Sequence, residues 1–184
     1  MPAVGFGINI LWKYSSTPGR PGTPSLNWPE GMQTGRTRGR STLVMFAHPQ
    51  CPCTNATLGE LAIIMAHSQD RLDADVFFYA PASQPESWVR SELWNATSAI
   101  PGVHVFEDPE AHMAERFGVF TSGQTLLYDP QGHLQFTGGI TALRGHSGDN
   151  AGRSAIIALV RGGKSQFGAL PEVTPVLGCG LRGE

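Results

Sequence analysis

Apolar positions in the middle of this chain follow two patterns, a continuous run and a repeat of three to four residues. The apolar run over residues 42–47 predicts a buried strand. Within residues 54–67 the apolar side chains recur every three or four positions, as on one face of a helix: Leu58, Leu61, Ala62 and Met65. Another strand is predicted over residues 75–80, so this part of the chain predicts a β-α-β unit.

The next stretch carries start and stop signals for two further helices. Ser83 and Glu86 have the spacing of a capping box, and an apolar stripe follows them: Trp88, Val89 and Leu93. A short strand is predicted over residues 103–106. The sequence Asp108-Pro109-Glu110 predicts the opening of a second helix, which is expected to end at Phe117-Gly118.

A hairpin and a last helix complete the pattern. Short apolar runs at residues 126–128 and 134–136 flank Asp129-Pro130-Gln131-Gly132, which has the composition of a type I turn. The last helix is expected to begin at Gly148 or Asp149 and to turn Ile156, Ile157 and Val160 inward. The whole pattern predicts an α/β fold with a mixed central sheet flanked by helices.

Glycine and proline divide the chain into three parts. Many of the 23 glycines and 14 prolines lie before residue 40 or after residue 162, which predicts loose ends around a denser middle. We therefore expect an apolar stump and an extended tether over 1–39, the folded domain over 40–163 and a tail over 164–184. The apolar residues 3–12 are too few to cross a bilayer of about 30 Å, but they resemble the truncated end of a membrane anchor. A surface-packed tail is the alternative.

Composition narrows the functional classes. A length of 184 residues suits one core, and a net charge of −2 argues against nucleic acid or anionic lipid as a partner. The three cysteines are an odd number, and two of them are one residue apart. This pattern argues against a secreted disulfide framework.

Cys51-Pro52-Cys53 lies where the first strand ends and the first helix begins. The first turn of a helix has unpaired N–H groups and the positive end of the helix dipole, and both favour a thiolate over a thiol. The pKa of a cysteine in such a place can fall from about 8.5 to between roughly 3.5 and 7.5. We therefore predict two reactive thiols, exposed at the helix tip and ionised near neutral pH.

The order of elements resembles the thioredoxin superfamily over about residues 40–162. Phe46-Ala47-His48-Pro49-Gln50-Cys51-Pro52-Cys53 stands where that family has its strand, short loop and active-site cysteines. The second half is similar to extracytoplasmic, membrane-tethered members of the superfamily, and the RedB-like subgroup is the nearest candidate. The segments that carry this similarity are Asp108-Pro109-Glu110, Phe117-Gly118-Val119, Thr125-Leu126-Leu127-Tyr128-Asp129 and Gly132. The resemblance implies exchange with protein thiols or disulfides. It also implies a tethered, periplasmic location, whereas a start at Met1 would indicate the cytoplasm.

Two positions depart from the family pattern. Cys53 aligns with the second cysteine of the family's Cys-x-x-Cys motif, Gln50 aligns with the first, and Cys51 lies between them. Gly123 replaces the family's groove proline, so it cannot supply the fixed cis bond found there. Both differences weigh against ordinary disulfide reductase activity.

Cys51 is expected to attack and Cys53 to resolve. Pro52 removes an N–H and stiffens the ring that a disulfide between them would close, and such a small strained ring is oxidising and labile. Cys179 lies in a small apolar island of the tail, so we expect this island to dock and Cys179 to resolve a mixed disulfide or complete a metal site. An idle thiol is the alternative.

Three other residues are candidate modulators of the thiols. A cationic His48 would lower a neighbouring thiol pKa, although a lone histidine more often only bonds backbone. The loop over residues 138–150 borders the groove in the fold that the chain resembles. Arg144 and His146 are therefore expected either to approach the thiols or to belong to a merely flexible loop.

Two alternative functions stay open beside a cofactor-free oxidoreductase. His48, Cys51 and Cys53, with or without Cys179, have the donor types that suit copper or zinc. A protein that handles either metal is the first alternative. The second is a catalytically silent interaction module, which the absence of the groove proline favours.

Overall fold

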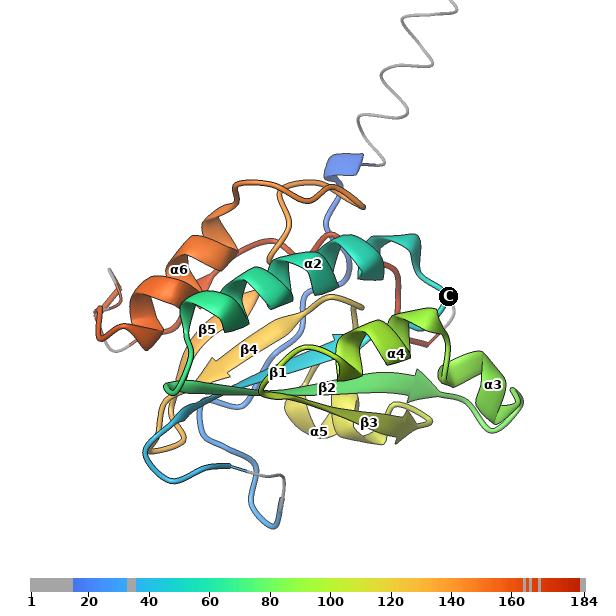
Figure 1. Cartoon of the computed structure of the whole chain (residues 1–184), viewed down its shortest axis with the longest axis horizontal. Helices are drawn as coiled ribbons and strands as arrows, with labels where there is room; N and C mark the ends of the chain where they lie inside the picture. The colour runs from blue at the N-terminus through green and yellow to red at the C-terminus, as the bar shows by residue number, and fades with distance from the viewer. Residues whose placement is uncertain (1–14, 33–35, 164, 166, 169, 183–184) are drawn as a thin grey trace, which may run out of the picture.

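The structure, a computed structural model, describes residues 15–32, 36–163, 165, 167–168 and 170–182. A six-stranded mixed sheet with the strand order β3-β2-β1-β4-β5-β6 forms its centre (Figure 1). The first three strands run parallel, β4 is antiparallel to β1, β5 is antiparallel to β4, and β6 is parallel to β5. The strands are β1 Ser41–Ala47, β2 Leu72–Ala80, β3 Val103–Pro109, β4 Thr125–Tyr128, β5 Leu134–Gly138 and β6 Glu172–Val173.

Helices cover both faces of the sheet (Figure 1). Three of them lie on one face: α2 Pro52–His67, α4 Glu92–Ser98 and α6 Ala151–Val160. The short helix α5, His112–Phe117, covers the other face, and α3, Glu86–Val89, follows the end of β2. The predicted α/β architecture with a mixed central sheet is confirmed.

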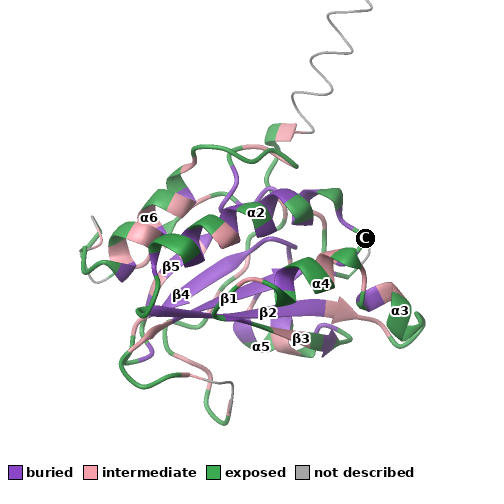
Figure 2. Cartoon of the chain, in the orientation of Figure 1, coloured by how far each residue is buried: buried purple, intermediate pink, exposed green. Residues whose placement is uncertain are grey.

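Each face of the sheet has its own apolar core, because successive side chains of a strand point to opposite faces. In β1, Leu43 and Met45 pack beneath α2 and α6, whereas Val44 and Phe46 pack toward α5. Figure 2 shows the central strands β1, β2 and β4 as the most continuously buried part of the chain. Both faces of β1 are therefore buried, which explains its unbroken apolar run.

The element boundaries follow the sequence pattern closely in the first unit and in the hairpin. The predicted strands and helix match β1, α2 and β2, with α2 beginning two residues and β2 three residues earlier than expected. The predicted turn between β4 and β5 also forms, because the Gly132 N–H donates to the Asp129 carbonyl at 2.9 Å.

The predicted opening of α5 is wrong. Asp108-Pro109-Glu110 does not start the helix, because β3 continues through Pro109 and the helix begins at His112. The Asp108 carboxylate nevertheless accepts hydrogen bonds from the backbone N–H groups of Met113 and Ala114, at 2.7 and 3.0 Å. Asp108 therefore serves the N–H groups of the helix from the preceding strand.

Two other predicted helix starts also differ. The capping box of Ser83 and Glu86 does not form: Pro85 is the N-cap of α3 and supplies no side-chain bond. Helix α6 is capped by Asn150, whose side chain accepts from the Arg153 N–H at 2.7 Å, rather than by Gly148 or Asp149.

The chain ends are less loose than their composition predicts. The Trp28 ring packs edge-on against Phe117 and Tyr128, and the backbone N–H of Trp28 donates to the Gly132 carbonyl at 2.8 Å. At the other end β6 joins the sheet, and Leu181 is buried in the core beside α5. The described parts of both predicted extensions therefore pack on the domain.

Candidate functional site

The turn between β1 and α2 places two of the three cysteines at a helix start. Cys51 is the N-cap residue of α2, its N–H donates to the His48 carbonyl at 3.1 Å, and Pro52 occupies the first turn. Proline suits this position because the N–H that it lacks would have no partner within the helix. Cys53 follows inside the same turn, as the spacing predicts.

The predicted exposure of this pair is wrong. Cys51 exposes 3% of its surface and Cys53 exposes 6%. The exposed positions of the turn belong instead to Gln50 and Pro52, on either side of Cys51. The cysteines point inward because another segment of the chain covers them.

The C-terminal segment supplies this cover. The Ser122 N–H donates to the Cys179 carbonyl at 2.8 Å, and the Leu181 N–H donates to the Phe120 carbonyl at 2.9 Å. Thr121 and Gly180 thereby form an antiparallel bridge. In Figure 1 the red C-terminal segment runs behind α2 toward the end at which this helix begins.

Close contact fixes the path of this segment. A Cβ atom on Gly178 would lie 1.8 Å from the Ser122 carbonyl oxygen, so only glycine fits this position without a backbone shift. Val176, Leu177 and Leu181 are buried on either side of it. The segment is therefore held at both ends, with Cys179 between them.

The three sulfur atoms form one cluster. Cys51 Sγ lies 2.8 Å from Cys179 Sγ, and all three Sγ atoms lie within 4.8 Å of one another. All three cysteines are free thiols in this structure. The sequence predicts docking of the tail near the thiols, and the structure places Cys179 directly against Cys51.

The three thiols differ in acidity. Burial raises the pKa of Cys51, but hydrogen bonds from the Cys179 thiol and from the backbone N–H groups of Cys53 and Cys179 outweigh this effect, so the pKa is lowered overall. Burial and the neighbouring Cys51 charge raise the pKa of Cys53. Burial, with the hydrogen bond to Cys51 and the repulsion between thiolates, raises the pKa of Cys179 to about 12. The prediction of a lowered pKa is thus wrong for Cys53.

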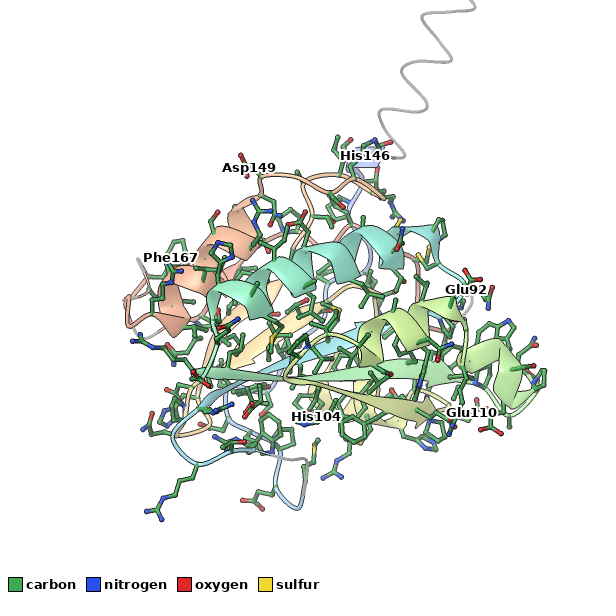
Figure 3. All side chains as sticks on the ribbon, viewed as in Figure 1. Glu92, His104, Glu110, His146, Asp149 and Phe167 are labelled. Carbon is green, nitrogen blue, oxygen red and sulfur yellow. The ribbon has the colours of Figure 1, made fainter. Side chains whose placement is uncertain are left out.

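Arg144 acts on the thiols, and His146 bonds within its own loop. The positive charge of Arg144 lowers the pKa of Cys53 and of Cys179 against the larger effect of burial, and its Nη1 donates to the Gly178 carbonyl at 2.7 Å. The His146 ring bonds to the Arg144 carbonyl at 2.7 Å and lies at the outer edge of the molecule (Figure 3). The approach to the thiols expected of His146 stays a prediction.

His48 stands beside the turn but outside the sulfur cluster. Its Nδ1 accepts from the Gln50 N–H at 3.2 Å, and its ring packs against Tyr79 and Trp88. Burial lowers its pKa, which disfavours the cationic form expected to assist a thiolate. Among the described residues, the group of potential metal ligands at this site consists of the three cysteines without His48.

Two hydroxyl groups form hydrogen bonds with the backbone of the turn at His48. Ser122 Oγ accepts from the His48 N–H at 2.9 Å, and Thr54 Oγ1 donates to the His48 carbonyl at 3.0 Å. Gly123 follows Ser122 with a φ of 86°, and its N–H donates to the Phe46 carbonyl at 2.7 Å. The position that aligns with the family's groove proline therefore joins the tail-binding segment to β1.

Glu60 is a site residue that the sequence reasoning missed. It is fully buried on α2, and its carboxylate accepts from the Gly148 N–H at 2.7 Å and from Arg153 Nη1 at 2.7 Å. These bonds hold the loop that carries Arg144. A charged residue within the inward helical stripe Thr57, Glu60, Leu61 and Ile64 was the available signal.

No helix in the described part of the chain is long and apolar enough to cross a membrane. The apolar residues 3–12 lie outside the described residues, so the predicted anchor stump stays a prediction.

Comparison with known proteins found matches in structure but not in sequence. No protein-family model matches the sequence, and no curated protein matches it significantly. Among solved structures, an oxidised thioredoxin-like protein superimposes with a TM-score of 0.51 at 13% identity, over 79% of this chain and 98% of its own. This chain has a thioredoxin-like fold.

Two further solved structures superimpose on more of this chain. A hypothetical protein from Sinorhizobium meliloti 1021 has a TM-score of 0.62 at 20% identity, over 92% of this chain and 96% of its own. An uncharacterised conserved protein from Geobacillus kaustophilus has the same TM-score at 16% identity, over 92% and 95%. At these identities the similarity shows the fold alone and says nothing of the chemistry of the three thiols.

Proposed function

We propose that this protein is a thiol–disulfide oxidoreductase acting on protein thiols or disulfides, with Cys51 as the attacking thiol and Cys179 as its resolving partner. The observation that carries the proposal is the 2.8 Å contact between Cys51 Sγ and Cys179 Sγ. Two sulfurs at this separation need only a small movement to reach the disulfide bond length of about 2.05 Å. The sequence predicts Cys53 as the resolving thiol. In this proposal Cys53 competes with Cys179 for that role.

The acidities support this assignment of roles. Cys51 receives several hydrogen bonds that lower its pKa, so it is the thiol best suited to ionise first and attack. The raised pKa of Cys179 keeps it protonated until Cys51 has become part of a disulfide. Loss of the Cys51 charge then removes one cause of the raised pKa.

The reaction balances without a cofactor. The Cys51 thiolate attacks one sulfur of a partner disulfide and expels the other as a thiolate, which forms a mixed disulfide. Cys179 then loses its proton, attacks Cys51 Sγ and expels the second partner sulfur. The partner gains two electrons, the protein retains a Cys51–Cys179 disulfide, and the reverse sequence oxidises a partner dithiol.

Burial adds a gating step to this scheme. Cys51 is almost fully covered, so a protein partner reaches it only when the segment around Cys179 lifts from residues 120–122. When the segment returns, it brings Cys179 to the mixed disulfide. Attack and resolution are thereby separated in time.

Single cysteine variants test this proposal. Cys51→Ser is expected to lower the rate of exchange with a model protein disulfide by about 10³-fold or more, because it removes the nucleophile. Cys179→Ser should accumulate the mixed disulfide, and the matched Cys53→Ser control should still resolve it. Resolution lost in Cys53→Ser and retained in Cys179→Ser would reverse the two roles. No exchange by the wild-type protein would favour the silent interaction module.

A metal-handling function is the second candidate, and the three-sulfur cluster favours it. Three thiolates within 4.8 Å offer a soft donor set that suits Cu(I) and also Zn(II). Cys51, Cys53 and Cys179 would hold the ion, and the charge of Arg144 would offset part of theirs. Anaerobic titration separates the functions: one tightly bound Cu(I) per chain without disulfide exchange would favour the metal function.

The compartment remains a prediction from the sequence resemblance. An extracytoplasmic, tethered location would suit a disulfide donor, because disulfides persist in oxidising compartments. Fractionation of the source cells, with the native protein detected by antibody, tests it: recovery with the membrane supports the tether, and recovery with the cytoplasm contradicts it.

A further inference from the structure

A cavity of about 700 Å³ opens beside the sulfur cluster. Its walls come from four separate parts of the chain: residues 18–20, the stretch 111–121 that contains α5, Arg144, and the C-terminal segment 178–182. Cys179 lines this cavity, whereas Cys51 and Cys53 do not. Cys179 is also the least buried of the three cysteines. The cavity is therefore a route to one sulfur of the cluster.

The charged lining of the cavity is mainly positive. Arg20, Arg144 and Arg182 contribute to it, against one carboxylate from Glu115. Glu115 already pairs with Arg182. The cavity thus carries a cationic excess beside a thiol.

One arginine of this lining, Arg20, has no carboxylate partner in the described part of the chain. Its guanidinium lies 4.2 Å from the centre of the Phe120 ring, and no ion pair of the described residues includes it. A guanidinium placed in this way is suited to bind a carboxylate. Arg144 lines the same cavity and donates to the carbonyl oxygens of Gly178 and Thr17, at 2.7 and 3.1 Å.

We propose that this cavity binds a small thiol carrying carboxylate groups, which reduces a Cys51–Cys179 disulfide by attacking Cys179. The inference rests on the proposed Cys51–Cys179 couple and adds the class of its electron donor. A cavity of this volume suits a molecule of that size. Protein partners would exchange at Cys51, and the small thiol would exchange at the opposite sulfur of the same disulfide.

The exchange balances in two steps. The thiolate of the small molecule attacks Cys179 Sγ, the Cys51–Cys179 bond breaks, and Cys51 leaves as a thiolate. Backbone N–H groups of Cys53 and Cys179 donate to this departing sulfur. A second small thiolate then attacks the small-molecule sulfur of the mixed disulfide, which releases Cys179 to take up a proton and yields the small-molecule disulfide.

A charge series of small thiols tests the inference on the oxidised full-length protein. The probes are mercaptosuccinate with two carboxylates, neutral 2-mercaptoethanol and cationic cysteamine. Each rate is divided by the rate of the same thiol with an uncharged model disulfide, which removes differences in thiol reactivity. At low salt we expect this ratio to be about fivefold higher for mercaptosuccinate than for 2-mercaptoethanol, and lowest for cysteamine. High salt should reduce the preference.

Arg20→Gln should reduce the preference for mercaptosuccinate by about threefold, because it removes one guanidinium from the cavity. The matched control is Arg116→Gln, which removes the same charge from an exposed residue of α5 that bonds the Glu30 carbonyl instead. The control should leave the preference unchanged. An equal effect of both variants would indicate general charge steering and overturn the site.

Mapping the first mixed disulfide completes the test. Rapid quenching with one equivalent of mercaptosuccinate should place the adduct on Cys179. An adduct on Cys51, or equal corrected rates for all three thiols, would overturn the inference and leave the Cys51–Cys179 couple standing. A failure to detect any disulfide to Cys179 in the oxidised protein would overturn both proposals.

Discussion

Helix α2 holds later parts of the chain at two places, and the two attachments differ in chemistry. Midway along the helix, the buried Glu60 carboxylate accepts from Gly148, Asn150 and Arg153, and its charge is matched by a guanidinium. At the start of the helix, Cys51 meets the thiol and the backbone N–H of Cys179, with the Cys53 thiol beside them. The first attachment is balanced in charge and hydrogen bonding, so it serves as structure. The second leaves three thiols of different acidity together, which is a condition for chemistry.

The difference predicts that the two attachments fail in different ways. Glu60→Gln should lower the free energy of unfolding by about 3 kcal/mol, because the largely buried Arg153 loses its buried counter-charge. Denaturant unfolding measures this change. The matched control Asp149→Asn removes the fully exposed partner of the same arginine and should leave the free energy of unfolding almost unchanged. Equal costs would show that Glu60 is no anchor.

The sulfur attachment depends on a close backbone approach. Gly178→Ala places a Cβ atom 1.8 Å from the Ser122 carbonyl oxygen, so the segment around Cys179 must shift. We expect formation of the Cys51–Cys179 disulfide to slow by at least about tenfold. Quantitative thiol trapping over time measures this rate. Gly59→Ala is the control, since its nearest neighbour in space lies at 3.6 Å. An unchanged rate in Gly178→Ala would contradict the role of this segment.

The smallest expected effect is a shift in thiol ionisation. The pKa of Cys51 is lowered, so its thiolate persists to a lower pH than that of an ordinary cysteine. Ultraviolet thiolate absorbance of the reduced protein should therefore show a first ionisation below the usual range, which Cys51→Ser removes. Cys179→Ala should move this ionisation to higher pH, because Cys51 loses the hydrogen bond from the side chain at position 179. A shift to lower pH would contradict the proposed contact.

The fold was predictable from the sequence because its signals are local. The helical spacing in residues 54–67 and the turn at Asp129–Gly132 depend on neighbouring residues, and both elements form as expected. Asp108 shows the limit of such signals. A first-turn composition predicts a helix there, but pairing with β2 keeps this stretch in a strand.

The candidate site was less predictable because its decisive contact joins residues 128 positions apart in the chain. The position of Cys51 at the helix start followed from the strand and helix pattern. Its burial did not, because the covering segment is held by a glycine contact and by backbone bonds to residues 120–122. The apolar side chains around Cys179 predicted that this segment docks, but side-chain types carry no signal for the backbone pairing that fixes where it docks. The role expected of His48 failed for a similar reason, since aromatic neighbours from β2 and α3 hold its ring.

The most direct test of the central claim is peptide mapping of the protein after mild oxidation under denaturing quench. The account predicts that the first disulfide to form links Cys51 to Cys179, with Cys53 recovered as a free alkylated thiol. A first disulfide between Cys51 and Cys53, with Cys179 free, would contradict it.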